Sequence, residues 1–164
     1  MSTHLKNLSS TSLNPNKVFK KIGVGIAVSA WNPEITNTLK EGAVEFLLNM
    51  GVRHKNIFIA EVPGSYELPQ AALWLAAQKN IDAVITLGCV IQGETRHFDF
   101  ICDACANGVM QVGLNTGKPC VFGVLTTDNL TQAKQRAGGK YGNKGIEAAE
   151  TALKMFLLKQ RLLD

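Results

Sequence analysis

Four short apolar runs alternate with stretches in which apolar residues recur every three or four positions. The runs are residues 22–29, 56–60, 83–87 and 120–124, and the periodic stretches are residues 33–50, 68–76, 100–114, 130–137 and 146–157. Apolar runs of this kind are typical of parallel strands covered on both faces, and the periodic stretches are typical of helices. Their order predicts an α/β fold, a three-layer α/β/α sandwich built on a four-stranded, mainly parallel sheet.

The chain has 164 residues, enough for one domain with a substantial core. Residues 1–17 are rich in Ser, Thr and Asn, which predicts a flexible N-terminal arm ahead of a single domain over residues 18–164. The arm lacks a continuous apolar segment, so we do not expect a secretory signal. We expect no membrane association either, because the sequence contains no apolar run long enough to span a bilayer.

The charge and the cysteine content argue against several classes of function. The net charge is +4, but no basic block is longer than the pair Lys20–Lys21, which argues against a nucleic-acid partner. Cys102 and Cys105 form a C-x-x-C inside a predicted helix, where small buried side chains are a better interpretation than a redox or zinc site. The four cysteines therefore indicate a reduced, cytoplasmic protein.

A polar loop follows the apolar run 83–87. Between residues 93 and 99 it contains glycine, glutamate, threonine, arginine, histidine and aspartate. Ligand sites of open α/β sheets lie beyond the carboxyl ends of the strands, so this loop is the leading candidate site. The alternative interpretation is an ordinary solvated loop between a strand and a helix.

Two further strand ends carry candidate binding residues. Trp31 follows the first strand and could stack on a flat heterocycle, or it could cover the end of the sheet. Glu67 stands at a predicted helix start, where it could accept hydrogen bonds from substrate hydroxyls or simply favour the helix N-terminus.

Other residues suggest phosphate binding and proton transfer. Glu94 and Thr95, after Gly93, could present backbone N–H groups and a hydroxyl to a phosphate. Arg136 could grip the same group, although an ordinary surface charge is the simpler interpretation. His97 is the histidine of the polar loop and could move protons near neutral pH.

Two common nucleotide motifs are missing. The pair Gly23 and Gly25 lies within a strand and lacks the third glycine of a dinucleotide fingerprint, and no G-x-x-x-x-G-K-[ST] occurs. These observations disfavour a nicotinamide enzyme and a P-loop NTPase.

Five collinear segments resemble the 6,7-dimethyl-8-ribityllumazine synthase family. They are Trp31-Asn32, VPGSYELP at 62–69, ITLGCVIQGETRHFDF at 85–100, FGVLTT at 122–127 and QRAGGKYGNKG at 135–145. The resemblance implies a flavodoxin-like fold. It also implies the penultimate step of riboflavin biosynthesis, in which 5-amino-6-(D-ribitylamino)uracil and 3,4-dihydroxy-2-butanone 4-phosphate condense to the lumazine, phosphate and water. The family needs no cofactor and no metal.

The resemblance also implies residue roles. Trp31 would stack on the pyrimidine, the ribityl chain would be held by Ser65, Tyr66 and Glu67, and the pyrimidine edge would meet backbone groups of Cys89, Val90 and Ile91. Glu94 and Thr95 would bind phosphate, and His97 would transfer protons. Phe122, Arg136 and Lys144 would come from the neighbouring subunit, with Arg136 on the phosphate.

Family members assemble as pentamers, and in many bacteria sixty subunits form a hollow shell that could associate with riboflavin synthase. The short glycine-rich connection at 138–145 favours a shell. Ala30 and Gln92 stand where arginines are frequent, and Arg96 replaces a small residue, so the charge near the site departs from the usual pattern. A flavin carrier and a shell protein without activity remain the alternatives.

Overall fold

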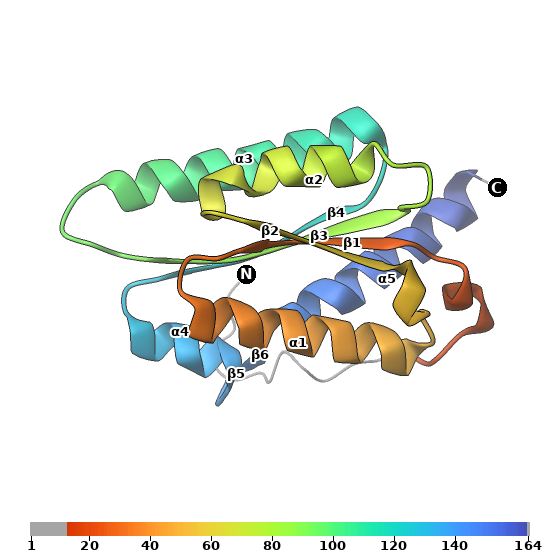
Figure 1. The fold of residues 1–164 in the computed structure, drawn as a ribbon, viewed down its shortest axis with the longest axis horizontal. Coiled ribbons are helices and arrows are strands. Elements are labelled where there is room, and N and C mark those ends of the chain that lie inside the picture. The colour runs from red at the N-terminus through yellow and green to blue at the C-terminus, as the bar shows by residue number, and fades with distance from the viewer. Residues whose placement is uncertain (1–12, 164) are drawn as a thin grey trace.

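The computed structural model describes residues 13–163 and has a parallel sheet at its centre (Figure 1). Its strands are β1 (Val24–Ser29), β2 (Ile57–Val62), β3 (Ala83–Ile91) and β4 (Cys120–Thr127). They pair in the order β2-β1-β3-β4, and every pairing is parallel. This order matches the first four strands of a flavodoxin-like sheet. The predicted fold class is confirmed.

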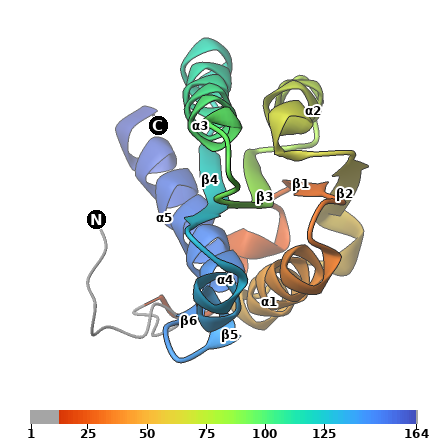
Figure 2. The same cartoon turned by 90° about the vertical axis from the view of Figure 1, so that its left-hand side faces the viewer.

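Helices cover both faces of the sheet, as Figure 2 shows. They are α1 (Pro33–Met50), α2 (Leu68–Ala76), α3 (His97–Thr116), α4 (Leu130–Arg136) and α5 (Lys144–Leu163). The short 3-10 turns are η1 (Lys17–Lys20), η2 (His54–Asn56) and η3 (Ser65–Glu67). Helices α2 and α3 lie on one face, and α1, α4 and α5 lie on the other (Figures 1 and 2). Each layer therefore buries one apolar face against the strands.

Two apolar clusters form the core, one on each side of the sheet. Strand β1 is buried along its whole length because it has a paired strand on either side and helices above and below. On the α1/α5 face, Ile26, Leu39 and Leu153 are fully buried. On the α2/α3 face, Leu68 and Cys105 are fully buried. Double coverage explains why β1 and β3 lack a polar alternation, whereas the edge strand β2 leaves Ile59 exposed.

The observed bounds of one strand and one helix differ from those predicted from the sequence. Strand β3 continues beyond the apolar run 83–87 to Ile91, and so includes Val90 and Ile91, which have strand character in the sequence. The strand stays paired with β4 beyond Gly88, as far as Ile91 opposite Thr127. Glycine suits the crowded position 88, because a Cβ there would lie 2.8 Å from Ser65 Oγ. Helix α3 begins at His97 and not near Phe100, so the histidine of the polar loop is the first helical residue.

The glycine-rich connection follows the end of α4 at Arg136 and has a structure of its own. It forms a small antiparallel hairpin, β5 (Ala137–Gly139) with β6 (Gly142–Asn143). Gly138 and Gly142 take φ values of +97° and +83°, which are unfavourable for residues with a Cβ.

Most of the predicted arm lies outside the described residues, which begin at Leu13. Leu13 packs against the core cluster, and the backbone N–H of Asn16 donates to Met50 O at 3.3 Å. The division into an arm over 1–17 and a domain over 18–164 stays a prediction. Among residues 13–163, no helix combines the length and the apolar character needed to cross a membrane.

Candidate active site

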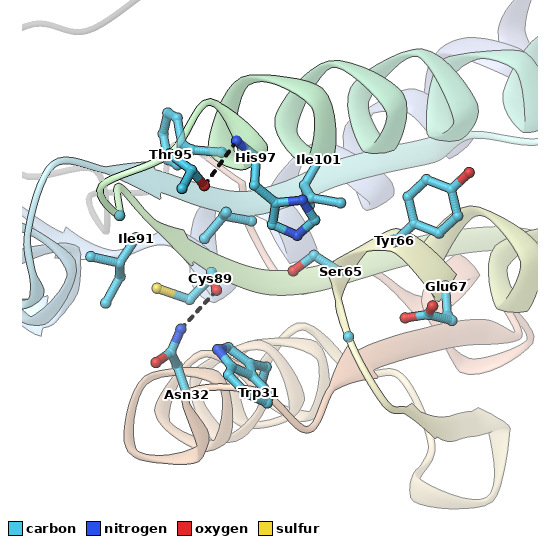
Figure 3. A pocket seen from close by; sticks show the side chains of 14 residues that line it. Trp31, Asn32, Ser65, Tyr66, Glu67, Cys89, Ile91, Thr95, His97 and Ile101 are labelled. Carbon is cyan, nitrogen blue, oxygen red and sulfur yellow. Dashed lines mark hydrogen bonds between the residues drawn. The ribbon is translucent and has the colours of Figure 1, made fainter.

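A cavity of about 750 Å³ opens at the carboxyl ends of β1, β2 and β3 (Figure 3). Its lining comes from three segments that the sequence singled out and from the first turns of α3. The lining residues are Trp31, Asn32, Gly64, Ser65, Tyr66, Glu67, Cys89, Val90, Ile91, Gly93, Thr95, His97, Phe98 and Ile101. A cavity in this place is where open parallel sheets bind ligands.

Trp31 and Asn32 form the wall that follows β1. The backbone N–H of Ala30 donates to Val62 O at 2.8 Å, and that of Trp31 donates to Ser29 Oγ at 3.2 Å. Asn32 has φ 57° and ψ 56°, a left-handed conformation that asparagine tolerates better than most residues. The Trp31 side chain is 71% exposed, so its indole is available to a ligand.

The second wall is the η3 turn between β2 and α2. Ser65 is buried below the cavity, whereas Tyr66 is 61% exposed. Glu67 is the residue that precedes α2, yet its carboxylate makes no capping hydrogen bond to the helix. A carboxylate that is not engaged by the helix start can accept hydrogen bonds from ligand hydroxyls.

The floor of the cavity is the end of β3. Cys89 is buried, and burial raises the pKa of its thiol from 9.0 to about 11. The thiol is therefore neutral near pH 7 and is a poor nucleophile, because the thiolate is the reactive form. Cys89, Val90 and Ile91 line the cavity at this end of the strand.

The third wall is the start of α3. The backbone N–H of His97 donates to Thr95 Oγ1 at 3.4 Å, and both residues line the cavity (Figure 3). Figure 3 shows the His97 ring reaching in from the α3 side while Trp31 approaches from the α1 side. Glu94 is exposed, and its neighbours Gly93 and Thr95 line the cavity. Free backbone N–H groups at the start of a 20-residue helix favour an anion.

The family model described as 6,7-dimethyl-8-ribityllumazine synthase matches residues 21–160. A protein of that name from Cytophaga hutchinsonii is 58% identical over 94% of this chain and 97% of its own length. The proteins of that name from Porphyromonas gingivalis and Flavobacterium johnsoniae are 48% and 44% identical, over 94% and 98% of this chain and 96% and 85% of their lengths. The chain belongs to the 6,7-dimethyl-8-ribityllumazine synthase family. The resemblance drawn from the five segments is confirmed.

Three of the expected site residues of this lumazine synthase do not line the cavity. They are the residues that the resemblance assigns to a neighbouring subunit. Phe122 and Lys144 line a separate hollow of about 310 Å³ between β4 and α5. There Lys144 Nζ lies 2.8 Å from Glu147 Oε1. Arg136 ends α4, with its guanidinium carbon 5.4 Å from the ring centre of Tyr141.

Sequence reasoning missed part of the lining. Phe98 and Ile101 face the cavity because α3 begins at His97, which places Ile101 one helical turn beyond the histidine. A helix predicted to begin near Phe100 does not place His97 and Ile101 on the same helical face. The sequence motif Trp31-Asn32 does not reveal that the Asn32 side chain contacts the floor of the cavity. Within residues 13–163, no group of three or more His, Cys, Asp or Glu side chains is arranged to hold a metal ion.

Proposed function

We propose that this chain condenses 5-amino-6-(D-ribitylamino)uracil with 3,4-dihydroxy-2-butanone 4-phosphate to form 6,7-dimethyl-8-ribityllumazine, phosphate and water. The observation that carries the proposal is family membership, with 58% identity over nearly the full length of a relative named for that product. The cavity at the sheet edge supports it because the chemistry of its walls matches the two substrates.

The pyrimidine and its ribityl chain fit the walls formed by Trp31 and the η3 turn. The exposed indole of Trp31 offers a face for stacking on a flat ring. Backbone groups of Cys89, Val90 and Ile91 would meet the edge of that ring. Ser65, Tyr66 and Glu67 would hold the ribityl hydroxyls, and the carboxylate of Glu67, which does not cap α2, would accept from them.

The phosphate of the second substrate fits the start of α3. The hydroxyl of Thr95 and the backbone of Glu94 would bind it, helped by the positive end of the helix dipole. His97 then stands beside both substrates. Its imidazole would move protons during imine formation, phosphate departure and ring closure.

A second copy of the chain would complete the site. Phe122, Lys144 and Arg136 lie outside the cavity of their own chain, which supports their role as residues of a neighbour's site. An apolar groove of about 570 Å³ runs beside the Phe122 hollow between α3 and α5. Its rim includes Leu114 and Leu162, each 70% exposed, and exposed apolar patches of this kind mark interfaces.

We place this association within a homopentamer. The short hairpin at 137–143 supports the closure of pentamers into a sixty-subunit shell, which could associate with riboflavin synthase. The thiols of Cys89, Cys102, Cys105 and Cys120 are free, in keeping with a cytoplasmic location.

The direct test supplies purified protein with both substrates and follows the fluorescence of the lumazine. We expect turnover to depend on both substrates and to release one phosphate per lumazine. Protein with each substrate alone is the control. Absence of product, or a preparation that is yellow with stoichiometric flavin and makes no lumazine, would overturn the proposal in favour of a carrier.

A further inference from the structure

A charged pair lies in the hollow between β4 and α5 that also contains Phe122. Lys144 Nζ lies 2.8 Å from Glu147 Oε1, and the two side chains are only 27% and 31% exposed. The second carboxylate oxygen, Oε2 of Glu147, is buried and accepts no hydrogen bond from residues 13–163. The carboxylate of Glu147 therefore depends on Lys144 for its balancing charge, because a half-buried carboxylate without a partner is costly.

The stability of α5 does not explain a lysine at this position. Lys144 is the first residue of the helix, where the positive end of the helix dipole disfavours a cation. Glu147 follows three residues later on the same face, and its negative charge suits the first turn. A cation at the unfavourable end of a helix, beside an aromatic ring in a hollow, is better explained by contact with a ligand.

The start of α5 is fixed against α1 by backbone contacts. The backbone N–H of Gly145 donates to Asn143 Oδ1 at 2.8 Å, and Asn143 Nδ2 donates to Thr38 O at 2.9 Å. A Cβ on Gly145 would collide with Leu39 O, so the two helices are in close contact there. The backbone of Lys144 is therefore held in place, and the ion pair restricts the long side chain that remains flexible.

We propose that Glu147 is a positioning residue for Lys144 in the site shared between subunits. This inference rests on the proposed function, in which Lys144 and Phe122 enter the site of a neighbouring subunit. The carboxylate neutralises the ammonium, so the pair offers N–H donors without net charge. Such a pair suits the uncharged ribitylaminouracil better than the phosphate, which Arg136 would bind from the end of α4.

A double-mutant cycle on KM tests this role. Glu147→Gln keeps the shape of the side chain and removes its charge, and Lys144→Met removes the ammonium. We expect each change to raise KM for the ribitylaminouracil about three- to tenfold, the effect of losing one partly exposed, hydrogen-bonded charge. KM for the butanone phosphate should change less than about twofold on the same scale. Glu147→Gln should add nothing in a chain that already carries Lys144→Met, because a positioning residue acts only through its partner.

Glu41→Gln is the matched control, because it makes the same substitution at an exposed glutamate of α1 outside the hollow. It should leave both KM values nearly unchanged. Additive effects of Glu147→Gln and Lys144→Met would show that the carboxylate acts without the lysine and would overturn the positioning role. Unchanged kinetics in Glu147→Gln, or an equal rise in both KM values, would overturn it as well.

Binding of the ribitylaminouracil, measured by calorimetry, separates this inference from the proposed function. Weaker binding in Glu147→Gln, with no further loss when Glu147→Gln is added to Lys144→Met, supports the positioning role even if the unmodified chain makes no lumazine. Equal binding in the unmodified chain and in every variant, or binding in none of them, overturns it. Failure of the unmodified chain to make lumazine counts against the proposed function alone.

Discussion

The side-chain amide of Asn32 donates a 2.9 Å hydrogen bond to the carbonyl oxygen of Cys89 (Figure 3). This bond ties the loop that carries Trp31 to the end of β3, across 57 residues of sequence. The hydrogen bond therefore holds the wall of the cavity against its floor. Asn32 also adopts a left-handed backbone conformation that few residues tolerate.

Replacing Asn32 should separate the contribution of its side-chain hydrogen bond to stability from that of its backbone conformation. Asn32→Gly keeps the left-handed backbone accessible and removes the hydrogen bond, which should lower the free energy of unfolding by about 1 kcal/mol. Asn32→Ala should lose roughly 1 kcal/mol more, because alanine is strained in that conformation. Urea unfolding monitored by circular dichroism measures both. Equal stability of Asn32→Gly and Asn32→Ala would contradict the role assigned to the backbone.

Removing Arg136 should impair use of the phosphate substrate. Arg136→Ala loses a charge-assisted contact and should lose about 2–4 kcal/mol of transition-state stabilisation, seen as a fall in kcat/KM for the butanone phosphate. Arg136→Lys should recover only part, since an ammonium lacks the planar fork. Lys134→Ala is the control, because it removes another exposed cation of α4, one that pairs with Glu34 of α1. Unchanged kcat/KM in Arg136→Ala would remove the residue from the site.

Mixing two impaired variants should raise activity above that of either one if the site is shared between subunits. His97→Ala damages the wall at α3, and Arg136→Ala damages the part supplied by the neighbour. Co-expressed chains should form some interfaces with one intact site, so the mixture should exceed the activity of either variant alone. The control is each variant co-expressed with itself. If mass spectrometry shows mixed assemblies and no activity returns, the site lies within one chain.

His97→Ala should lower kcat by roughly 10–100-fold, at or below the low end of the usual general acid–base contribution. The reactants are an amine and an activated ketone, so holding them together supplies much of the acceleration. KM should change little. His54→Ala is the control, because that exposed histidine lies outside the cavity. Preserved kcat with a large rise in both KM values would make His97 a binding residue.

Stability should fall at alkaline pH partly because of Cys89. Burial raises the pKa of this thiol from 9.0 to about 11, so below pH 9.0 it is neutral whether the chain is folded or unfolded. Between those values the unfolded chain releases its proton first, and stability decreases as pH rises, by up to roughly 1.4 kcal/mol per pH unit.

Cys89→Ala should flatten this part of the pH profile, measured as the free energy of urea unfolding from pH 8 to 11. Cys120→Ala should do the same, since burial raises the pKa of its thiol to about 11 as well. Identical slopes for the unmodified chain and for Cys89→Ala would contradict the assignment.

The architecture can be predicted from the amino-acid sequence, because burial of a strand or a helix leaves a local pattern of apolar residues. Runs such as residues 83–87 are apolar without alternation since they are covered on both faces, and helical stripes repeat at 3.6 residues. The sequence also predicts that Trp31, Glu67 and His97 lie at one edge of the sheet, since the carboxyl ends of parallel strands meet there. The proposed roles at this edge depended on resemblance to a family.

The contacts between segments that are distant in the sequence are visible only in the tertiary structure. Nothing near Asn32 in the sequence indicates that its amide reaches Cys89. Nothing near Gly88 indicates that Ser65 leaves no room for a Cβ at that position. The glycines at 138–142 interrupt the helical pattern, and only the structure shows that they form a hairpin that lies against Gln135 and brings Tyr141 close to Arg136. Local periodicity encodes which face of an element is buried, whereas the partners on that face depend on how the strands and helices pack together.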